Sequence, residues 1–284
     1  MDLIHIIYGL SFIVFGPLIG GIIAGLDRKM TARMQGRVGP PVLQPFYDII
    51  KLFSKEKIAV IYSESFWVLA YLIFIVITGM LFFAGGDLLL VIFALTLAHV
   101  FLILGAFASS SPYAHIGAER ELIQLMAIEP MVILTAVGMY QVTGSFFVTD
   151  ILSHAGLLVL VLPGVFVGFV YVLTFKLRKS PFDLATSHHA HQELVKGLTT
   201  EFSGPTLGMY ELAHLYEIVM LLGFVYIFFG MVPAIGILAV IIVYFLEIFI
   251  DNATTRITWQ PALISAWIVT LVFGGLNLVA LYLL

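Results

Sequence analysis

Basic residues in this chain are confined to alternate connections between long apolar segments. Lysine and arginine together number 13, and all lie in four of the seven connections: 27–64, 111–120, 176–208 and 251–261. The three connections between them contain none: 85–87, 145–156 and the turn at Val232. Because cytoplasmic loops of membrane proteins are enriched in lysine and arginine, the alternation predicts on which side of a membrane each connection lies.

Eight apolar segments lie between and beside these connections, and each is long enough to cross a hydrocarbon core of about 30 Å. They are Leu3–Leu26, Ser65–Ala84, Leu88–Ser110, Glu121–Gly144, Leu157–Phe175, Met209–Met231, Pro233–Ile250 and Ala262–Leu284. The sequence therefore predicts an all-α integral membrane protein, an eight-transmembrane-helix bundle forming one membrane domain over residues 1–284. The loops at 27–64 and 176–208 are expected in the cytoplasm and both termini outside.

Composition supports a membrane location. The chain is 61% hydrophobic and 11% charged, which is typical of membrane proteins rather than soluble domains. No basic region and no A-x-A cleavage site precede the first apolar segment, so we expect it to be retained as a helix. The chain has no cysteine, which excludes thiolate-held iron–sulfur clusters and disulfides. We therefore expect no cofactor and no metal in this chain, and any redox centre in a partner protein.

The first basic connection combines a shaped turn with an amphipathic stretch. Gly36, Gly39 and the prolines at 40–41 are typical of a defined turn rather than a solvated tail. Polar residues then recur at steps of four, three and four from Gln44 to Lys55, opposite an apolar side. Residues 42–55 are therefore expected to form a short helix in the plane of the membrane interface. Two interpretations stay open for this connection: a docking surface, or a loop that only sets topology.

Ionisable residues also occur inside or at the ends of three predicted spans, the fourth, sixth and seventh. A carboxylate near the bilayer centre costs about 2.5–3.5 kcal/mol on insertion scales and usually faces the protein interior. The pattern favours a proton-conducting or polar cavity over ordinary hydrogen bonding between helices. In contrast, His99 stands alone in the third span and is expected to be a structural histidine. The groups predicted to form the path are Glu119, Glu121, Glu129, Glu211, His214, Glu217, Glu247 and Asp251.

Three histidines cluster in the 176–208 loop, at His188, His189 and His191. A metal site is one interpretation, but no cysteine or second histidine cluster completes a coordination sphere. Imidazoles beside a proton path, or a polar contact surface for a partner, fit the sequence better.

Two motifs resemble the signature loops of the family that contains subunit 1 of complex I, a membrane component of NADH-quinone oxidoreductase, and its relatives in membrane-bound [NiFe] hydrogenases. The first is ARMQGRVGP at 32–40, and the second is PFDL at 181–184 followed by EFSG at 201–204. The resemblance covers essentially the whole chain. It implies a protein that anchors a peripheral electron-transfer arm and begins the acidic path to the ion-pumping subunits, with Glu193 and Glu201 as further members of that path.

The resemblance also implies partners and a docking surface. The expected partners are hydrogenase large and small subunits, a ferredoxin-like iron–sulfur subunit, an antiporter-like membrane subunit and the lipid bilayer of a prokaryotic cytoplasmic membrane, without nucleic acid. Nickel–iron and iron–sulfur centres would belong to those subunits. The residues expected to dock the soluble arm are Arg28, Arg33, Arg37, Lys176, Arg178, Asp183, His188, His189 and His191.

Departures from the quinone-reducing members favour the energy-converting hydrogenases of the Ech, CO-linked and formate hydrogenlyase types. Quinone-reducing members usually have a glutamate where this chain has Lys176, and acids where this chain has its histidine cluster. The resemblance thus predicts coupling of ferredoxin-type electron transfer and H₂ chemistry to H⁺ or Na⁺ transport. Two alternatives remain: the quinone-site membrane subunit of an NADH- or F420H2-type quinone oxidoreductase, and a freestanding secondary transporter, although the chain shows no internal repeat of the kind transporters carry.

Overall fold

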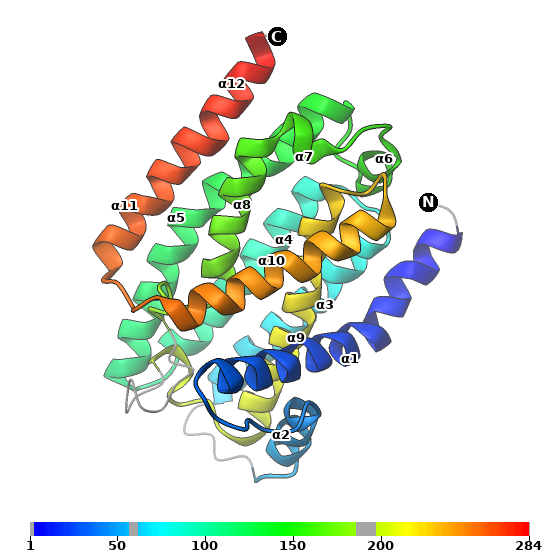
Figure 1. Cartoon of the computed structure of the whole chain (residues 1–284). Coiled ribbons are helices and arrows are strands. Elements are labelled where there is room, and N and C mark those ends of the chain that lie inside the picture. Colours follow the sequence, from blue (N-terminus) through cyan, green and yellow to red (C-terminus); the bar gives the residue numbers. More distant parts are fainter. Residues whose placement is uncertain (1–2, 57–61, 186–196, 284) are drawn as a thin grey trace.

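The computed structural model describes residues 3–56, 62–185 and 197–283. Within these ranges the regular structure is all helical, as predicted, and the helices form a bundle with a short helix lying across one end (Figure 1). Seven of the described helical segments are long and apolar enough to cross a membrane. They are α1 (Leu3–Met34), α3 (Tyr62–Phe83), α4 (Leu88–Phe107), α5 (Pro112–Thr143), α9 (Gly204–Ile227), α10 (Pro233–Ala253) and the continuous run α11 (Trp259–Val269), η2 (Thr270–Gly275, a π-helical turn) and α12 (Leu276–Leu283).

The predicted fifth span, Leu157–Phe175, is divided in the structure. It consists of α7 (Leu158–Val161) and α8 (Pro163–Lys176), separated at Leu162. Proline has no N–H to donate and its ring clashes with the preceding helical turn, so the helix restarts at Pro163. At 14 residues, α8 is about 21 Å long and shorter than a hydrocarbon core of about 30 Å. The described structure thus has seven full-length spans where the sequence predicted eight.

Two helices extend beyond the predicted spans at the same end of the bundle. Helix α1 continues to Met34 instead of ending at Leu26, so Arg28 and Arg33 lie on a helix rather than in a loop. Helix α5 begins at Pro112, well before its predicted start at Glu121. Prolines occupy the first turn of α2, α5, α8, α9 and α10, where the missing N–H would have no helical partner anyway.

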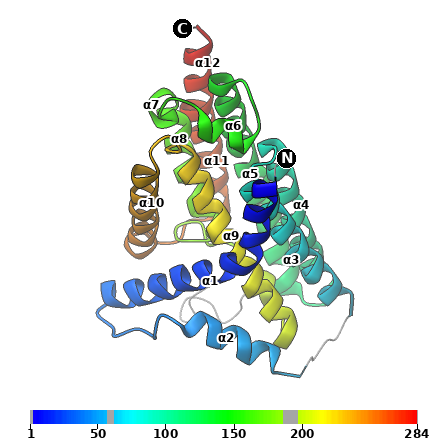
Figure 2. The same ribbon diagram turned by 90° about the vertical axis from the view of Figure 1, so that its right-hand side faces the viewer.

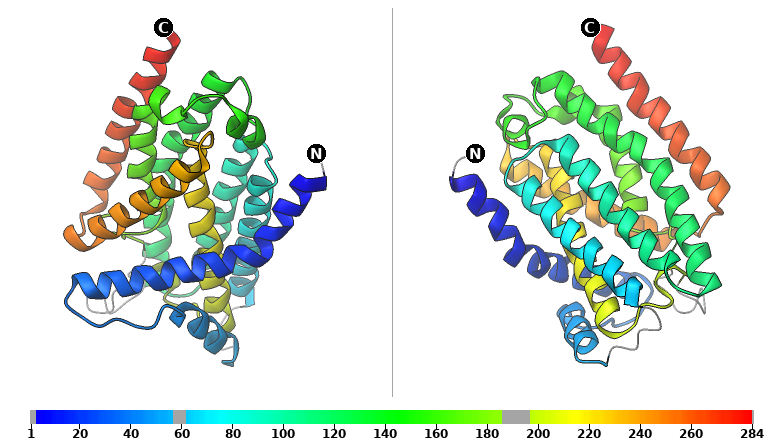
Figure 3. Two further views of the ribbon diagram at one scale, coloured as in Figure 1. Left: turned by 45° about the vertical axis from the view of Figure 1, so that its right-hand side comes forward. Right: turned by 180° about the vertical axis from the view of Figure 1, so that it is seen from behind.

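The predicted in-plane helix is present as α2 (Gln44–Phe53), which lies across the end of the bundle (Figure 2). Both chain ends lie on the side of the bundle away from α2 (Figure 3). Helix α1 changes direction along its length, so that its second half runs beneath the bundle beside α2. Pro17 lies inside α1 and accounts for a bend, because a proline removes one bond of the helical ladder.

Close backbone approach fixes α1 against its neighbours. A side-chain carbon added at Gly20 would lie 2.1 Å from the backbone oxygen of Leu215 on α9, and one at Gly25 would lie 1.8 Å from that of Val42. Only glycine allows such contacts. They bring α1, α9 and the turn before α2 together around the region that holds most of the buried charges.

The start of the predicted 176–208 loop is packed inside the bundle. From Lys176 to Ala185 every residue except Pro181 is buried. Gln124 of α5 donates a hydrogen bond to the backbone oxygen of Phe182 at 2.6 Å, and the N–H of Ile257 donates to that of Pro181 at 3.2 Å. We call residues 176–185 the buried segment. The short helices α6 (Val148–Ser153) and η1 (Gly197–Thr199) complete the described elements.

Candidate functional site

The buried segment carries three cations into the bundle, and each meets an acid, two of them on α5 and one on α1. Lys176 Nζ lies 2.9 Å from Glu129 Oε1, and Arg178 Nη2 lies 3.0 Å from Glu121 Oε1. Arg178 also donates to the hydroxyl of Tyr210 at 3.0 Å. Both basic residues are only 5% exposed. Because an unpaired buried charge is strongly destabilising, these pairs hold the segment in place.

Lys179 joins the buried segment to α1 and α10. Its Nζ lies 2.7 Å from Asp27 Oδ2 and 3.9 Å from Asp251 Oδ2. Tyr244 donates to the same Asp27 oxygen at 2.9 Å, and the N–H of Ser180 donates to Asp251 at 2.8 Å. Three elements at this end of the bundle are therefore tied together through one lysine.

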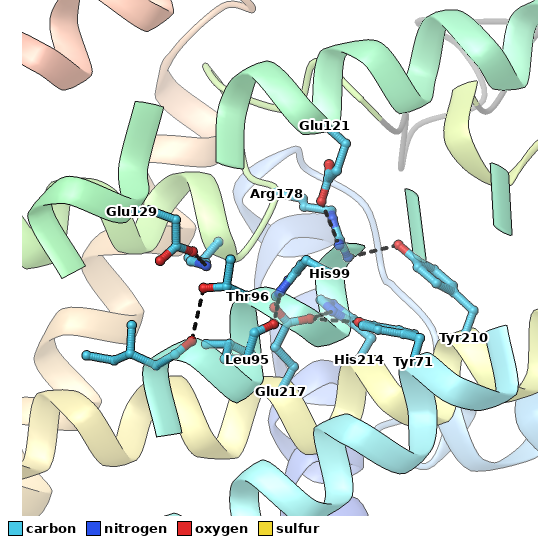
Figure 4. A network of polar contacts seen from close by, with 12 residues as sticks. Tyr71, Leu95, Thr96, His99, Glu121, Glu129, Arg178, Tyr210, His214 and Glu217 are labelled. Carbon is cyan, nitrogen blue, oxygen red and sulfur yellow. Dashed lines mark hydrogen bonds and ion pairs between the residues drawn. The ribbon is translucent and has the colours of Figure 1, made fainter. Parts of the chain in front are cut away.

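A second cluster surrounds Glu217 at the middle of α9, and Figure 4 shows its partners converging from several helices. Glu217 is fully buried. His99 Nε2 of α4 lies 2.8 Å from Glu217 Oε1, and Tyr71 of α3 donates to Oε2 at 3.1 Å. His214, one turn earlier on α9, has its Nδ1 3.8 Å from Oε2. The carboxylate thus faces two imidazoles and a phenol in a place shielded from solvent.

Glu247 of α10 differs from the other buried acids. It is fully buried, yet within the described part of the chain neither carboxylate oxygen accepts a hydrogen bond. The hydroxyl of Thr174 lies near the carboxylate without satisfying hydrogen-bond geometry, and Lys179 and Asp251 act on it through their charges. An ionisable group held in this way weakens the fold, so its presence points to a functional role rather than a structural one.

A cavity of about 490 Å³ opens at the α2 end of the bundle, and we call it the main cavity. Its walls come from α1, the turn before α2, α2, the buried segment, α9 and α10. Nine of its lining residues carry a formal charge: Asp27, Arg28, Arg37, Asp48, Arg178, Lys179, Asp183, Glu211 and Asp251. His214 also lines the cavity, so one end of the Glu217 cluster reaches this polar space.

The structure therefore brings together most of the predicted path. Glu211, His214 and Asp251 line the main cavity, whereas Glu121, Glu129, Glu217 and Glu247 lie deeper in the bundle. Two members lie apart from the network, because Glu119 on α5 and Glu201 before α9 are exposed. Glu193 falls outside the described residues.

The predicted docking residues divide into two groups. Three arginines are exposed at the α2 end, as expected for a contact surface: Arg28, Arg33 and Arg37. Three others are not on the surface, which corrects the expected position of Lys176, Arg178 and Asp183. The first two pair with acids of α5, and Asp183 accepts from Arg256 at 2.6 and 3.0 Å. The segment is basic and therefore resembles an exposed loop in sequence, but its bases are neutralised inside the bundle. The histidines at 188, 189 and 191 lie outside the described residues.

Sequence reasoning missed several members of the network. It expected a structural role for His99 without placing it beside Glu217, and it did not name Asp27, Lys179 or Tyr71 as members of the network. Asp27 and Lys179 lie at predicted span ends, where charges are ordinary. What distinguishes these residues is a charged or hydrogen-bonding partner on a distant element, such as Glu217 for His99 and Lys179 for Asp27. Within the part of the chain that the structure describes, no group of three or more potential metal ligands comes together.

Comparison with known proteins identifies the class. The family model described as NADH dehydrogenase matches residues 7–282. The chain is 32% identical to hydrogenase-4 component C of Escherichia coli over 221 residues, covering 72% of this chain and 69% of the relative. It is 30% identical to formate hydrogenlyase subunit 4 of the same organism, covering 74% and 73%. The corresponding NADH-quinone oxidoreductase subunit of Anoxybacillus flavithermus is 31% identical, covering 72% and 67%.

The chain belongs to the NADH dehydrogenase family that includes this NADH-quinone oxidoreductase subunit, and it is a multi-pass membrane protein. Among solved structures, it is similar to a chain of the membrane-bound sulfane sulfur reductase, an archaeal respiratory membrane complex. That match has a TM-score of 0.87 at 25% identity and covers 98% of this chain and 99% of the other. By distant homology, the chain is a membrane subunit of a multisubunit respiratory oxidoreductase complex.

Proposed function

We propose that this chain is the membrane anchor and ion-translocation coupling subunit of a multisubunit energy-converting [NiFe] hydrogenase. It would link ferredoxin-type electron transfer and H₂ evolution or uptake to H⁺ or Na⁺ transport. The nickel–iron centre and iron–sulfur clusters would lie in hydrogenase large and small subunits and a ferredoxin-like subunit, and an antiporter-like subunit would pack beside it. Its place would be a prokaryotic cytoplasmic membrane, with both termini outside.

The observation that carries the coupling role is the series of ionisable groups from the main cavity into the bundle. Glu211 and His214 line the cavity, Glu217 lies behind them, and Glu121 and Glu129 follow on α5. Ionisable residues at this depth are rare in membrane helices and mark ion or proton pathways. A purely structural bundle would place apolar side chains there.

The hydrogenase branch is supported by likeness to hydrogenase-4 component C and formate hydrogenlyase subunit 4, at 32% and 30% identity. The nine formally charged residues that line the main cavity suit a hydrated path for ions or protons.

A second candidate is the equivalent subunit of a sulfane sulfur reductase complex. The observation that favours it is full-length correspondence: that structure covers 98% of this chain and is itself covered to 99%. In this alternative the membrane protein keeps the same coupling role, and only the soluble redox partner differs.

The proposed topology has eight crossings, with α7 and α8 together forming the fifth. This arrangement keeps all the bases of the chain on one side, because α8 returns from the base-free connection at 145–156 to the buried segment. The α2 end would then face the cytoplasm and present Arg28, Arg33 and Arg37 to the soluble arm. Arginine suits this surface because its planar fork pairs with partner carboxylates and keeps its charge.

Purification through an affinity tag on this chain tests the proposal. Membranes solubilised in mild detergent should release a complex that contains nickel, evolves H₂ from a reduced ferredoxin, and drives ion uptake when reconstituted into vesicles. A complex with sulfane sulfur reductase activity and no nickel would establish the second candidate. Quinone reduction by NADH or reduced F420, or recovery of the chain alone, would refute both.

A further inference from the structure

His99 is held by both nitrogens of its ring. Nδ1 lies 2.9 Å from the backbone oxygen of Leu95, and Nε2 lies 2.8 Å from Glu217 Oε1. A backbone carbonyl can only accept, so the hydrogen bond to Leu95 requires a proton on Nδ1. In neutral imidazole the other nitrogen is then an acceptor, and it faces a carboxylate oxygen that also only accepts.

Two acceptors at this distance repel each other unless a proton lies between them. The contact therefore requires one more proton than neutral histidine and ionised glutamate supply. This additional proton resides on the imidazole, giving an ion pair, or on the carboxyl group, giving a neutral hydrogen bond. In either form, His99 and Glu217 together hold one proton that can change its position or leave.

The neighbours of this pair limit how its proton can exchange. His99 is 3% exposed and Glu217 is not exposed at all, so bulk water does not reach them directly. The ionisable groups that face Glu217 are Tyr71 on α3, His214 and Tyr210 on α9, and Arg178 from the buried segment. Of these, His214 and Arg178 also line the main cavity, and only His214 can both take up and release a proton there.

On its other side, His99 borders a second, small cavity. This space of about 10 Å³ is lined by His99, Glu121, Gln124 and Lys176 together with apolar side chains. It is close to the smallest volume that holds one water molecule, and its polar lining supplies hydrogen-bond partners. Glu121 belongs to α5, and Lys176 pairs with Glu129 of the same helix. His99 thus lies between Glu217 and the acids of α5, as Figure 4 shows.

We propose that His99 and Glu217 form a proton-sharing relay between the main cavity and the acids of α5. A proton that reaches Glu217 from the His214 side leaves a neutral carboxyl group beside an imidazolium on His99. The ring then turns, releases its Nε2 proton into the small cavity toward Glu121 and Glu129, and turns back, so that Nε2 accepts from Glu217 while Nδ1 keeps its proton for Leu95. Only O–H and N–H bonds form and break, and the pair returns to its starting state after each transfer. This inference rests on the proposed ion-translocating function and makes His99 a member of the path rather than a structural histidine.

The test compares four variants of the whole complex in sealed membrane vesicles: His99→Gln, Glu217→Gln, the double variant and His115→Gln. His115 is the matched control, because its Nε2 bonds a backbone oxygen, that of Ser109 at 3.0 Å, in place of a carboxylate. The readouts are subunit stoichiometry, redox turnover and ion uptake measured across a range of pH.

Each single relay variant should lower coupled uptake about a hundredfold, the lower end of what a positioned proton-transfer group contributes. The double variant should be no slower than either single variant, because the two residues act as one unit. The pH dependence of uptake should flatten in all three. His115→Gln should keep the rate and pH profile of the unaltered complex.

The outcomes separate the relay from the proposed function. Unaltered vesicles that translocate no ion would overturn both. Normal uptake and pH profile in His99→Gln vesicles would overturn the relay alone, as would a double variant slowed by the product of the two single effects. If the single variants fail to assemble, the double variant serves as the test, since it places two neutral amides in contact and leaves neither residue of the pair charged. An unaltered uptake rate in that variant would also refute the relay.

Discussion

The same substitution at two buried glutamates should change stability in opposite directions. Glu247 is fully buried, and neither of its oxygens accepts a hydrogen bond from the described residues. Glu129 is also inside the bundle, but it pairs with Lys176 at 2.9 Å. Methionine is close to glutamate in volume and is apolar, so Glu→Met at each position isolates the effect of the carboxyl group.

The magnitudes follow from the partners of each acid. A buried polar group without a partner costs about 1–3 kcal/mol, so Glu247→Met should stabilise the protein by about that amount. Removing one member of a buried ion pair costs about 3–5 kcal/mol because the other charge is left unpaired. Glu129→Met leaves the charge of Lys176 without this partner, and the side chain of Lys176 is only 4% exposed. The side chain of Glu129 is itself 15% exposed, which places the expected loss near the lower end.

Thermal unfolding of the purified complex in detergent measures both effects. A change of 1 kcal/mol shifts Tm by about 2–4 °C for a chain of comparable size. On that scale Glu247→Met should raise Tm by about 2–12 °C, and Glu129→Met should lower it by about 6–12 °C. Ion uptake should fall in both, since each loses a titratable group of the proposed path. If Glu247→Met lowers Tm as Glu129→Met does, then Glu247 has a structural partner and the reasoning from its missing hydrogen bonds is wrong.

Three further predictions concern the topology and the α2 end. Because the chain has no cysteine, Ser54→Cys should be labelled by an impermeant reagent only from the cytoplasm and Ser153→Cys only from outside; the reverse pattern would invert the topology. Arg37→Glu should release the soluble arm from membranes at moderate salt, and a complex that keeps full stoichiometry would exclude this surface as the docking site. Burial pushes the pKa of Asp48 upward, but hydrogen bonds from Arg28 and Gln44 and the charges of Arg28 and Lys51 together outweigh it and hold that pKa below its ordinary value. A carboxyl group whose pKa is lower in the folded than in the unfolded state stabilises the fold at pH values above its unfolded pKa. That stabilisation is lost as pH falls through its folded pKa. Asp48→Asn should therefore cost about 0.2–1 kcal/mol near neutral pH and nothing in acid, and an equal loss at both pH values would contradict the pairing.

Several parts of the fold follow from local sequence properties. Hydrophobicity adds along a segment, so seven of the predicted spans are found as full-length helices with ends shifted by only a few residues at most of their boundaries. The α2 helix was predictable because its apolar and polar residues alternate with the helical period. The division at Pro163 was also visible in principle, since the predicted span Leu157–Phe175 contains that proline.

The acids of the site were predictable for the same local reason: a carboxylate within apolar sequence stands out whatever surrounds it. Their environments were not. Four glutamates that look alike in the sequence have different surroundings in the described structure: Glu121 faces arginine, Glu129 lysine and Glu217 histidine, and Glu247 accepts no hydrogen bond there. These differences decide whether a substitution leaves a partner charge unpaired or removes an acid that has no partner.

The sequence alone therefore determined which segments enter the membrane and where acids interrupt them, because both depend on the nature of neighbouring residues. Tertiary structure decided which charges neutralise each other and which groups are placed to gain or lose a proton. The contacts of Asp27 with Lys179 and of His99 with Glu217 join positions 152 and 118 residues apart. No local pattern encodes such pairings, because they arise only when packing brings α1, α4 and α9 around the buried segment and excludes water from their charges.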